Sequence, residues 1–215
     1  MQFDSLQGFF ESTFGQVITI AVIIVLFILI LISGKKGKKT DVKGLVLSAI
    51  FVALYLVLNQ ITLFRMPQGG SITALSMLAI SLCGFTLGTR RGVMAGLCAG
   101  LLSMIFNPYI IHPIQMLLDY PLAVGALAFG GFLRNKKGGL LTSYIFGVIC
   151  RYICAFVSGT VFFGAYAPEG FNAVTWSLWY NLLYIDIEAA ISIAVLCIPP
   201  VRNAFYRIKR STGTL

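Results

Sequence analysis

Seven long apolar stretches alternate along the chain with short polar segments. They cover residues 16–33, 44–64, 71–88, 92–110, 115–133, 140–163 and 175–198. A helix of about 17 or more apolar residues can cross a hydrocarbon core about 30 Å thick. The pattern therefore predicts an all-α integral membrane protein with seven transmembrane spans in the lipid bilayer.

The basic residues follow alternate spans. Of the 16 Lys and Arg residues, all except Arg65 and Arg151 come after the first, third, fifth or seventh span. Such residues gather on the cytoplasmic side of membrane proteins. The distribution predicts an N-terminus outside and a C-terminus in the cytoplasm. It also explains the net charge of +9 by membrane topology, with no need for a nucleic-acid partner.

The first span, residues 16–33, is predicted to stay in the membrane as a lipid-facing helix. Residues 1–15 contain no Lys or Arg, unlike a signal peptide, and the apolar run ends in SGKKGKK, a stop-transfer pattern. The apolar run carries no polar stripe, so we expect the working part of the protein to lie after Lys43.

Composition excludes several classes of function. The chain is 58% hydrophobic and only 11% charged, against about 25% charged residues in soluble domains. It has one His, its five Cys residues lie in predicted spans, and no Gly-rich loop ends in Lys as a phosphate-binding loop does. We therefore predict no metal, no cofactor and no nucleotide hydrolysis by this chain. No nucleophile–base constellation indicates an enzyme.

Four ionisable side chains lie inside the predicted spans: Asp119, Arg151, Asp186 and Glu188. An ion at the bilayer centre costs at least about 2.5 kcal/mol, which makes each of them a candidate functional residue. At about 1.5 Å per residue, the last three lie at similar depths, about 16–20 Å from the outer surface. Arg151 has two open interpretations, an ion pair with Glu188 or Asp186 and a contact with a ligand. Asp119 lies only about 6 Å deep, with no obvious cation beside it.

Polar and aromatic residues recur at four-residue spacing on the last two spans, and so share one face of each helix. The two stripes are Arg151, Ala155, Gly159 and Phe163, and Trp176, Tyr180, Tyr184 and Glu188, with Asn181 beside the second. Trp176 and Asn181 lie about as deep as Asp119 and Tyr120. Because aromatic faces stack on rings and attract cations, this group predicts a pocket for a flat, polar heterocycle. Alternatively, Asp119 reaches headgroup water or caps a helix, and the Trp residues form an interfacial belt.

Small residues form two further patterns. Gly92, Gly96 and Gly100 recur at four-residue spacing, which is typical of close contact between membrane helices. Ala49 and Ala53 form a small patch on the second span.

Four motifs together resemble the thiamine-specific S components of energy-coupling-factor (ECF) transporters, the ThiT/YuaJ family. They are PQGGSITALSML (67–78), HPIQMLLDYPLA (112–123), RYICAFVSGTVFFGAYAPEG (151–170) and WSLWYN (176–181). In that family a six-helix membrane subunit binds the vitamin, and a separate coupling protein with two ATPases energises it. The resemblance implies a six-helix core at 44–205, preceded by an extra helix and basic linker at 1–43 and followed by a basic tail at 206–215.

The resemblance implies roles for residues that spacing had already grouped. The expected substrate-binding residues are Asp119, Tyr120, Arg151, Gly159, Phe163, Trp176, Tyr180 and Asn181. Ala49 and Ala53 correspond to the surface that docks on the coupling protein. The loop from Arg65 to Ser71 corresponds to a lid over the vitamin. Two positions depart from the family pattern, with Ala155 where members commonly have His and Trp176 where they have Tyr.

The resemblance therefore implies a thiamine-capturing subunit in a bacterial plasma membrane. Three alternatives remain open. The ligand is a thiamine precursor or related heterocycle, the chain is a self-sufficient proton-coupled carrier with a relay of Asp186, Glu188 and Arg151, or it is a membrane enzyme or assembly factor.

Overall fold

The computed structural model describes residues 21, 25, 28, 42–106 and 109–212, so the predicted first span lies outside the described residues apart from three positions. In chain order the elements are helix α3 (Val42–Gln60), strand β1 (Thr62–Arg65), 3-10 turn η1 (Pro67–Gly69), strand β2 (Ser71–Thr73), helices α4 (Ser76–Leu87), α5 (Thr89–Ser103) and α6 (Pro113–Leu117), π-helical turn η2 (Leu118–Leu122), helix α7 (Ala123–Ala126), 3-10 segment η3 (Leu127–Leu133), helix α8 (Gly139–Phe162), 3-10 turn η4 (Gly164–Tyr166), and helices α9 (Ala173–Cys197) and α10 (Pro199–Ser211).

Four described helical segments are long and apolar enough to cross a membrane. They are α3, the continuous stretch Pro113–Leu133, α8 and α9. The spans predicted at 71–88 and 92–110 are shorter in the structure, because α4 has 12 residues and α5 has 15. Every residue of α4 is buried, so this helix packs against protein on all sides. Its apolar sequence reflects a protein interior and not a lipid-facing surface.

The segment between α3 and α4 forms an antiparallel hairpin, where the hydropathy pattern predicted the ends of two spans. Thr62 pairs with Thr73, and Arg65 with Ser71. At the tip, Gln68 and Gly69 have φ angles of 65° and 89°, a left-handed conformation that favours Gly at tight turns. The strand residues of β1 are mostly exposed, whereas Ile72 and Thr73 of β2 are buried, so β2 is the strand that packs into the bundle.

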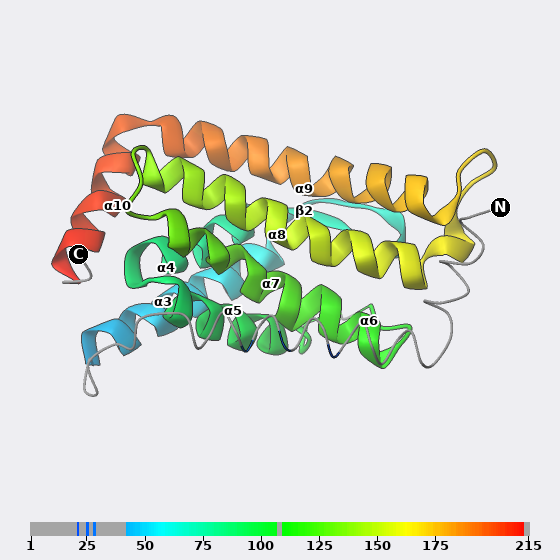
Figure 1. Ribbon diagram of the computed structural model, residues 1–215, viewed down its shortest axis with the longest axis horizontal. Coiled ribbons are helices and arrows are strands. Elements are labelled where there is room, and N and C mark those ends of the chain that lie inside the picture. The colour runs from blue at the N-terminus through cyan, green and yellow to red at the C-terminus, as the bar shows by residue number, and fades with distance from the viewer. Residues whose placement is uncertain (1–20, 22–24, 26–27, 29–41, 107–108, 213–215) are drawn as a thin grey trace.

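Helix α4 forms the centre of the bundle, with α3, α5, α8, α9, α10 and η3 packed around it (Figure 1). The Gly spacing on α5 allows the close contact that the sequence predicted. A Cβ on Gly96 would lie 2.7 Å from Gly125 Cα, and one on Gly100 would lie 2.6 Å from Pro121 Cα. Helix α5 therefore packs directly on the backbone of the segment that carries Asp119 and Tyr120.

The basic segments gather at one end of the bundle. Lys43 Nζ donates to Ser211 O at 2.7 Å, and the buried Lys209 Nζ donates to Arg134 O at 2.6 Å and Asn135 Oδ1 at 2.8 Å. Burial, and then the charge of Arg134, lowers the pKa of Lys209. Figure 1 shows α10 at this end, beside the C-terminus. Which side of the membrane this end faces stays a prediction.

The end of the chain also differs from the expected division. Helix α10 continues through the boundary predicted at residue 206 and ends at Ser211. Its Tyr206 ring lies 5.4 Å from the Phe85 ring, edge-on. The last described residues thus pack on the core and do not form a separate tail.

We expect Gly100→Ala to lower the free energy of unfolding by about 1–3 kcal/mol, because the added methyl overpacks the contact with Tyr120 and Pro121. Thermal unfolding of the purified protein in detergent measures this. Cys98→Ala is the control, because Cys98 is exposed on the same helix. Equal stability of the two variants would contradict the packing argument.

Candidate functional site

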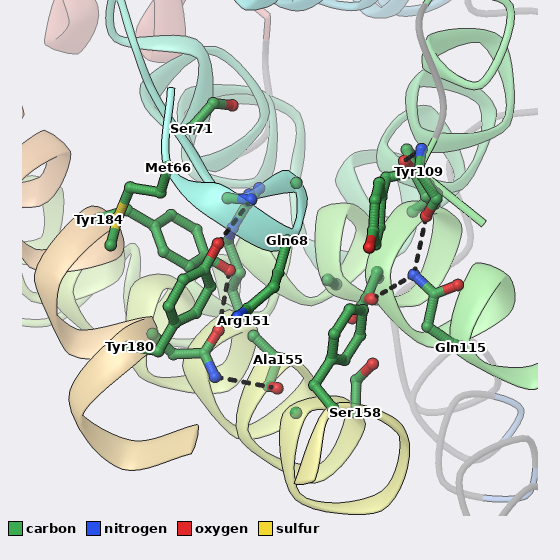
Figure 2. Close-up of a pocket in the computed structure, with 18 of the residues that line it drawn as sticks. Met66, Gln68, Ser71, Tyr109, Gln115, Arg151, Ala155, Ser158, Tyr180 and Tyr184 are labelled. Atoms are coloured by element: carbon green, nitrogen blue, oxygen red, sulfur yellow. Dashed lines mark hydrogen bonds between the residues drawn. The ribbon is translucent and has the colours of Figure 1, made fainter. Parts of the chain in front are cut away.

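A cavity of about 330 Å³ opens between the hairpin and the surrounding helices (Figure 2). Its walls come from α3, β1, α5, the residues Phe106 and Tyr109, the stretch from α6 to α7, α8 and α9. All eight residues predicted to bind substrate lie on its walls: Asp119, Tyr120, Arg151, Gly159, Phe163, Trp176, Tyr180 and Asn181. The two stripes predicted from four-residue spacing therefore face one common space, with the exception of Glu188, which does not line the cavity.

The carboxylate of Asp119 and the phenol of Tyr120 reach the cavity from the π-helical turn η2. Pro121 inside this turn has no N–H, which interrupts regular α-helical hydrogen bonding. Asp119 Oδ2 accepts a hydrogen bond from Gln115 Nε2 at 2.7 Å, and Tyr120 Oη accepts one from Tyr109 N at 2.7 Å. Both side chains are thus held in place while Asp119 keeps acceptor positions for a ligand.

Gln115 also connects Asp119 to the backbone at Tyr109 and Ile111. Gln115 Nε2 also donates to Tyr109 O at 3.1 Å, and Gln115 Oε1 accepts from Ile111 N at 3.2 Å. Sequence reasoning overlooked Gln115, although it lies four residues before Asp119 and so shares its helix face.

Arg151 reaches the cavity from the middle of α8. Its Nε and Nη1 atoms are buried and have no hydrogen-bond partner among the described residues. Tyr55, Tyr184 and Glu188 lie close enough to act on its charge. Within the described part of the chain Arg151 forms no ion pair with Glu188 or Asp186, so the pairing that helix depth suggested is wrong. Two guanidinium nitrogens therefore have no protein partner among the described residues.

Glu188 instead accepts four hydrogen bonds, two from the end of β2 and two from the start of α4, and it is only 3% exposed. Thr73 donates from N at 3.0 Å and from Oγ1 at 2.7 Å to Oε2. Ser76 Oγ at 3.2 Å and Met77 N at 2.9 Å donate to Oε1. A carboxylate at a helix N-terminus satisfies N–H groups that have no partner within the helix. Glu188 thus joins α9 to the base of the hairpin.

Asp186 lies on a different side of α9 and is exposed. One helical turn is about 3.6 residues, so a two-residue step turns the side chain away from Glu188. The three groups that a proton relay would need, Asp186, Glu188 and Arg151, are therefore not assembled into one chain of contacts.

Aromatic rings form two walls of the cavity. On one side the Phe163 ring stacks on Tyr109 at 6.1 Å and 25°. On the other, the Trp176 and Tyr180 rings lie 5.6 Å apart, and Tyr184 follows at 5.7 Å from Tyr180. The Trp176 Nε1 atom is buried without a hydrogen-bond partner among the described residues. These walls leave ring faces and one N–H group available to a flat ligand.

The Tyr109 phenol lies at the mouth, outside the membrane-spanning segments. A hydrogen bond with Tyr166 raises its pKa, with a smaller contribution from burial. The phenol therefore stays neutral near pH 7 and can donate a hydrogen bond.

Asn181 and Gly159 hold α8 against α9 beside the cavity. Asn181 Nδ2 donates to Ala155 O at 3.2 Å and Ser177 O at 2.8 Å, and its Oδ1 accepts from Tyr184 Oη at 2.9 Å. A Cβ on Gly159 would lie 3.0 Å from Asn181 Nδ2. Both residues line the cavity, and in this structure their contacts are with the protein. Asn181 also positions Tyr184 through the hydrogen bond to its hydroxyl.

The hairpin tip lies between the two aromatic walls (Figure 2). Gly70 N donates to Tyr180 Oη at 2.9 Å, and Tyr180 Oη donates to Pro67 O. A Cβ on Gly69 would lie 2.9 Å from Tyr109 Cβ, so the tip also touches the opposite wall. Of these cavity residues, Tyr109 carried no sequence signal that would have placed it here.

The two Ala residues predicted to dock on a coupling protein lie outside the cavity. Ala49 and Ala53 are one turn apart on α3, and both are exposed. Buried Phe51 and Tyr55 face the bundle. The small patch is thus available on the outer surface.

Comparison with known proteins points to one family. The model of the thiamine transporter protein family, Thia_YuaJ, matches residues 45–207. The thiamine transporter ThiT of Bacillus subtilis is 34% identical over 166 residues, which cover 70% of this chain and 86% of that protein. The thiamine transporter ThiT of Lacticaseibacillus paracasei is 33% identical over 116 residues, 44% of this chain and 58% of that protein.

A solved structure also resembles the described fold. ThiT from Listeria monocytogenes superposes with a TM-score of 0.61 at 28% identity, and the match covers 73% of this chain and 94% of that one.

We expect Glu188→Ala to lower the free energy of unfolding by about 3 kcal/mol or more, because it leaves Thr73 and Met77 with unpaired buried N–H groups. Thermal unfolding in detergent measures the loss. The matched control is Asp186→Ala, which lies two residues away on an exposed face and should change the stability by less than about 0.5 kcal/mol. An equal effect of both substitutions would refute the assigned role of Glu188.

Proposed function

Because the chain belongs to the thiamine transporter protein family, we propose that it captures thiamine as the substrate-binding subunit of an ECF-type uptake system. It is a membrane protein of a transporter family and not an enzyme. The observation that supports the proposal most directly is the cavity itself. It combines one carboxylate, Asp119, with two aromatic walls and a closing hairpin.

The chemistry of thiamine suits these walls. The vitamin has a cationic thiazolium ring, a flat aminopyrimidine ring and a hydroxyethyl tail. Asp119 engages the electropositive side of the ligand, while Phe163 and Trp176 stack on its rings. A cavity of about 330 Å³ is within the range of pockets for small molecules.

Polar groups without protein partners orient the ligand. Arg151 offers Nε and Nη1 to acceptor atoms of the vitamin, and Trp176 offers Nε1. Tyr120 and Tyr180 present hydroxyl groups at the wall and beneath the hairpin tip. Binding would satisfy buried donors that otherwise cost free energy, which favours a ligand with ring nitrogens or oxygens.

The residue at position 155 gives a reason to consider a second ligand. Family members commonly carry His there, whereas this chain places a small side chain on the wall and the larger Trp176 elsewhere in the cavity. A thiamine precursor or related heterocycle is therefore the alternative ligand.

Energy for uptake would come from other subunits. The sequence has no phosphate-binding loop. We infer that a coupling protein docks on Ala49 and Ala53, and that two ATPases drive it at the bacterial plasma membrane. A self-sufficient proton-coupled carrier is less well supported, since Asp186 and Glu188 have different environments and Arg151 pairs with neither.

The decisive experiment is a thiamine titration of the purified protein in detergent, followed by Trp fluorescence. We expect tight binding by the wild type and about 10–100-fold weaker binding by Asp119→Asn, because a hydrogen bond to a charged group contributes about 1.5–3 kcal/mol. Trp179→Phe is the control, because Trp179 is exposed and lies off the cavity. If the wild type fails to bind thiamine but binds a related heterocycle, the ligand must be reassigned.

The hairpin contact with Tyr180 leads to a kinetic prediction. We expect Tyr180→Phe to release bound thiamine about 3–10-fold faster, because it removes the hydroxyl that holds Gly70 and Pro67. Stopped-flow fluorescence with excess competing ligand measures the release rate. Tyr206→Phe, far away at the basic end, should leave the rate unchanged; if Tyr180→Phe does so as well, the hairpin does not control release.

A further inference from the structure

One carboxylate in the membrane has no role in the cavity. Asp186 lies 13 residues after the start of α9 at Ala173 and 11 residues before its end at Cys197. At about 1.5 Å per residue, it is about 20 Å from one end of the helix and about 17 Å from the other. Asp186 is thus close to the middle of a helix long and apolar enough to cross a membrane.

The surface around Asp186 is apolar. Five large hydrophobic residues are exposed on α8 and α9 near the depth of Asp186: Ile149, Ile153, Leu182, Leu183 and Ile187. The polar neighbour within electrostatic reach is Tyr152, but its hydroxyl donates to Leu178 O at 2.9 Å. Asp186 itself has no hydrogen bond or ion pair within the described part of the chain.

An exposed carboxylate at this depth is unfavourable in lipid. Acidic residues inside transmembrane segments almost always face a bundle interior or a water-filled cavity, and they pair with a cation or a donor. Among the described residues Asp186 does neither, whereas Glu188 and Asp119 are each held by hydrogen-bond donors. The outer face of α8 and α9 therefore carries a carboxylate without a partner in the described part of the chain, which is unfavourable if this face contacts lipid.

We propose that the α8–α9 face, defined by Asp186 and the five hydrophobic residues around it, docks a transmembrane helix of another protein that carries a Lys or Arg at mid-depth. Charge complementarity selects this occupant. The apolar residues supply packing on either side, and the basic side chain neutralises Asp186 where lipid cannot.

Other occupants fit the charge less well. The predicted first span, residues 16–33, contains no Lys, Arg or His. A second copy of the chain would present the same face, which carries no cation among its described residues. The face is also distinct from Ala49 and Ala53, because α3 packs on α4 and α5 while α9 packs on α8. Figure 1 shows α3 and α9 along opposite edges of the bundle.

The test compares Asp186→Leu with the wild type as full chains in cells that contain the native partners. A tagged chain is purified in mild detergent, and the amount of co-purifying membrane protein per chain is measured. We expect Asp186→Leu to reduce one integral membrane partner by about tenfold or more. Asp186→Glu should retain it, and Leu183→Ala, which removes packing but no charge, should retain most of it.

The second part of the test is a substitution in the partner protein. Replacing the Lys or Arg at mid-depth of its transmembrane helix by Leu should cause the same loss, and combining both substitutions should cause little further loss, because the two charges act as a pair. Thermal unfolding of the purified single chain should show Asp186→Leu to be at least as stable as the wild type, which excludes misfolding as the cause.

Two results would overturn the proposal. One is unchanged co-purification with Asp186→Leu, which would mean that the carboxylate faces lipid or water in the assembled protein. The other is a partner without a basic residue in its membrane helices, or a self-assembled dimer as the species lost. Neither readout requires thiamine, so the inference stands or falls independently of the proposed ligand.

Discussion

The hydrogen bonds of Glu188 are the interaction on which the other features depend. A buried carboxylate in a membrane bundle must be satisfied by the protein. Here the end of β2 and the start of α4 together satisfy it with two backbone and two hydroxyl donors. These bonds hold β2 and α4 against α9. The base of the hairpin is thereby fixed, while its tip is held separately by the single hydroxyl of Tyr180.

This arrangement determines what Arg151 can do. Because Glu188 accepts its hydrogen bonds from Thr73, Ser76 and Met77, the guanidinium of Arg151 keeps two buried nitrogens, Nε and Nη1, without partners among the described residues. An unpaired buried donor is costly, so the cavity is a site that a polar ligand would stabilise. Glu188 therefore has a structural role and Arg151 faces the cavity, although the two charges are close enough to interact.

Three acidic residues in the membrane consequently have three different environments. Glu188 faces the bundle interior and organises the hairpin. Asp119 lies on a π-helical turn and is oriented by Gln115 toward the cavity. Asp186 faces outward among apolar side chains. The same side-chain chemistry therefore serves architecture, the proposed ligand contact and the proposed docking contact, according to the helix face that carries it.

The sequence by itself determined the membrane class and the two stripes of α8 and α9, because hydropathy and four-residue spacing are local properties of a helix. The four motifs carried the family resemblance, which implied the full set of eight cavity residues. Only the tertiary structure decided the partners. Glu188 binds Thr73, 115 residues away, and no spacing rule links positions on separate elements. Helix depth alone suggested Arg151 as that partner. Likewise, hydropathy could not distinguish the protein-buried α4 from a lipid-facing span, because both environments exclude water.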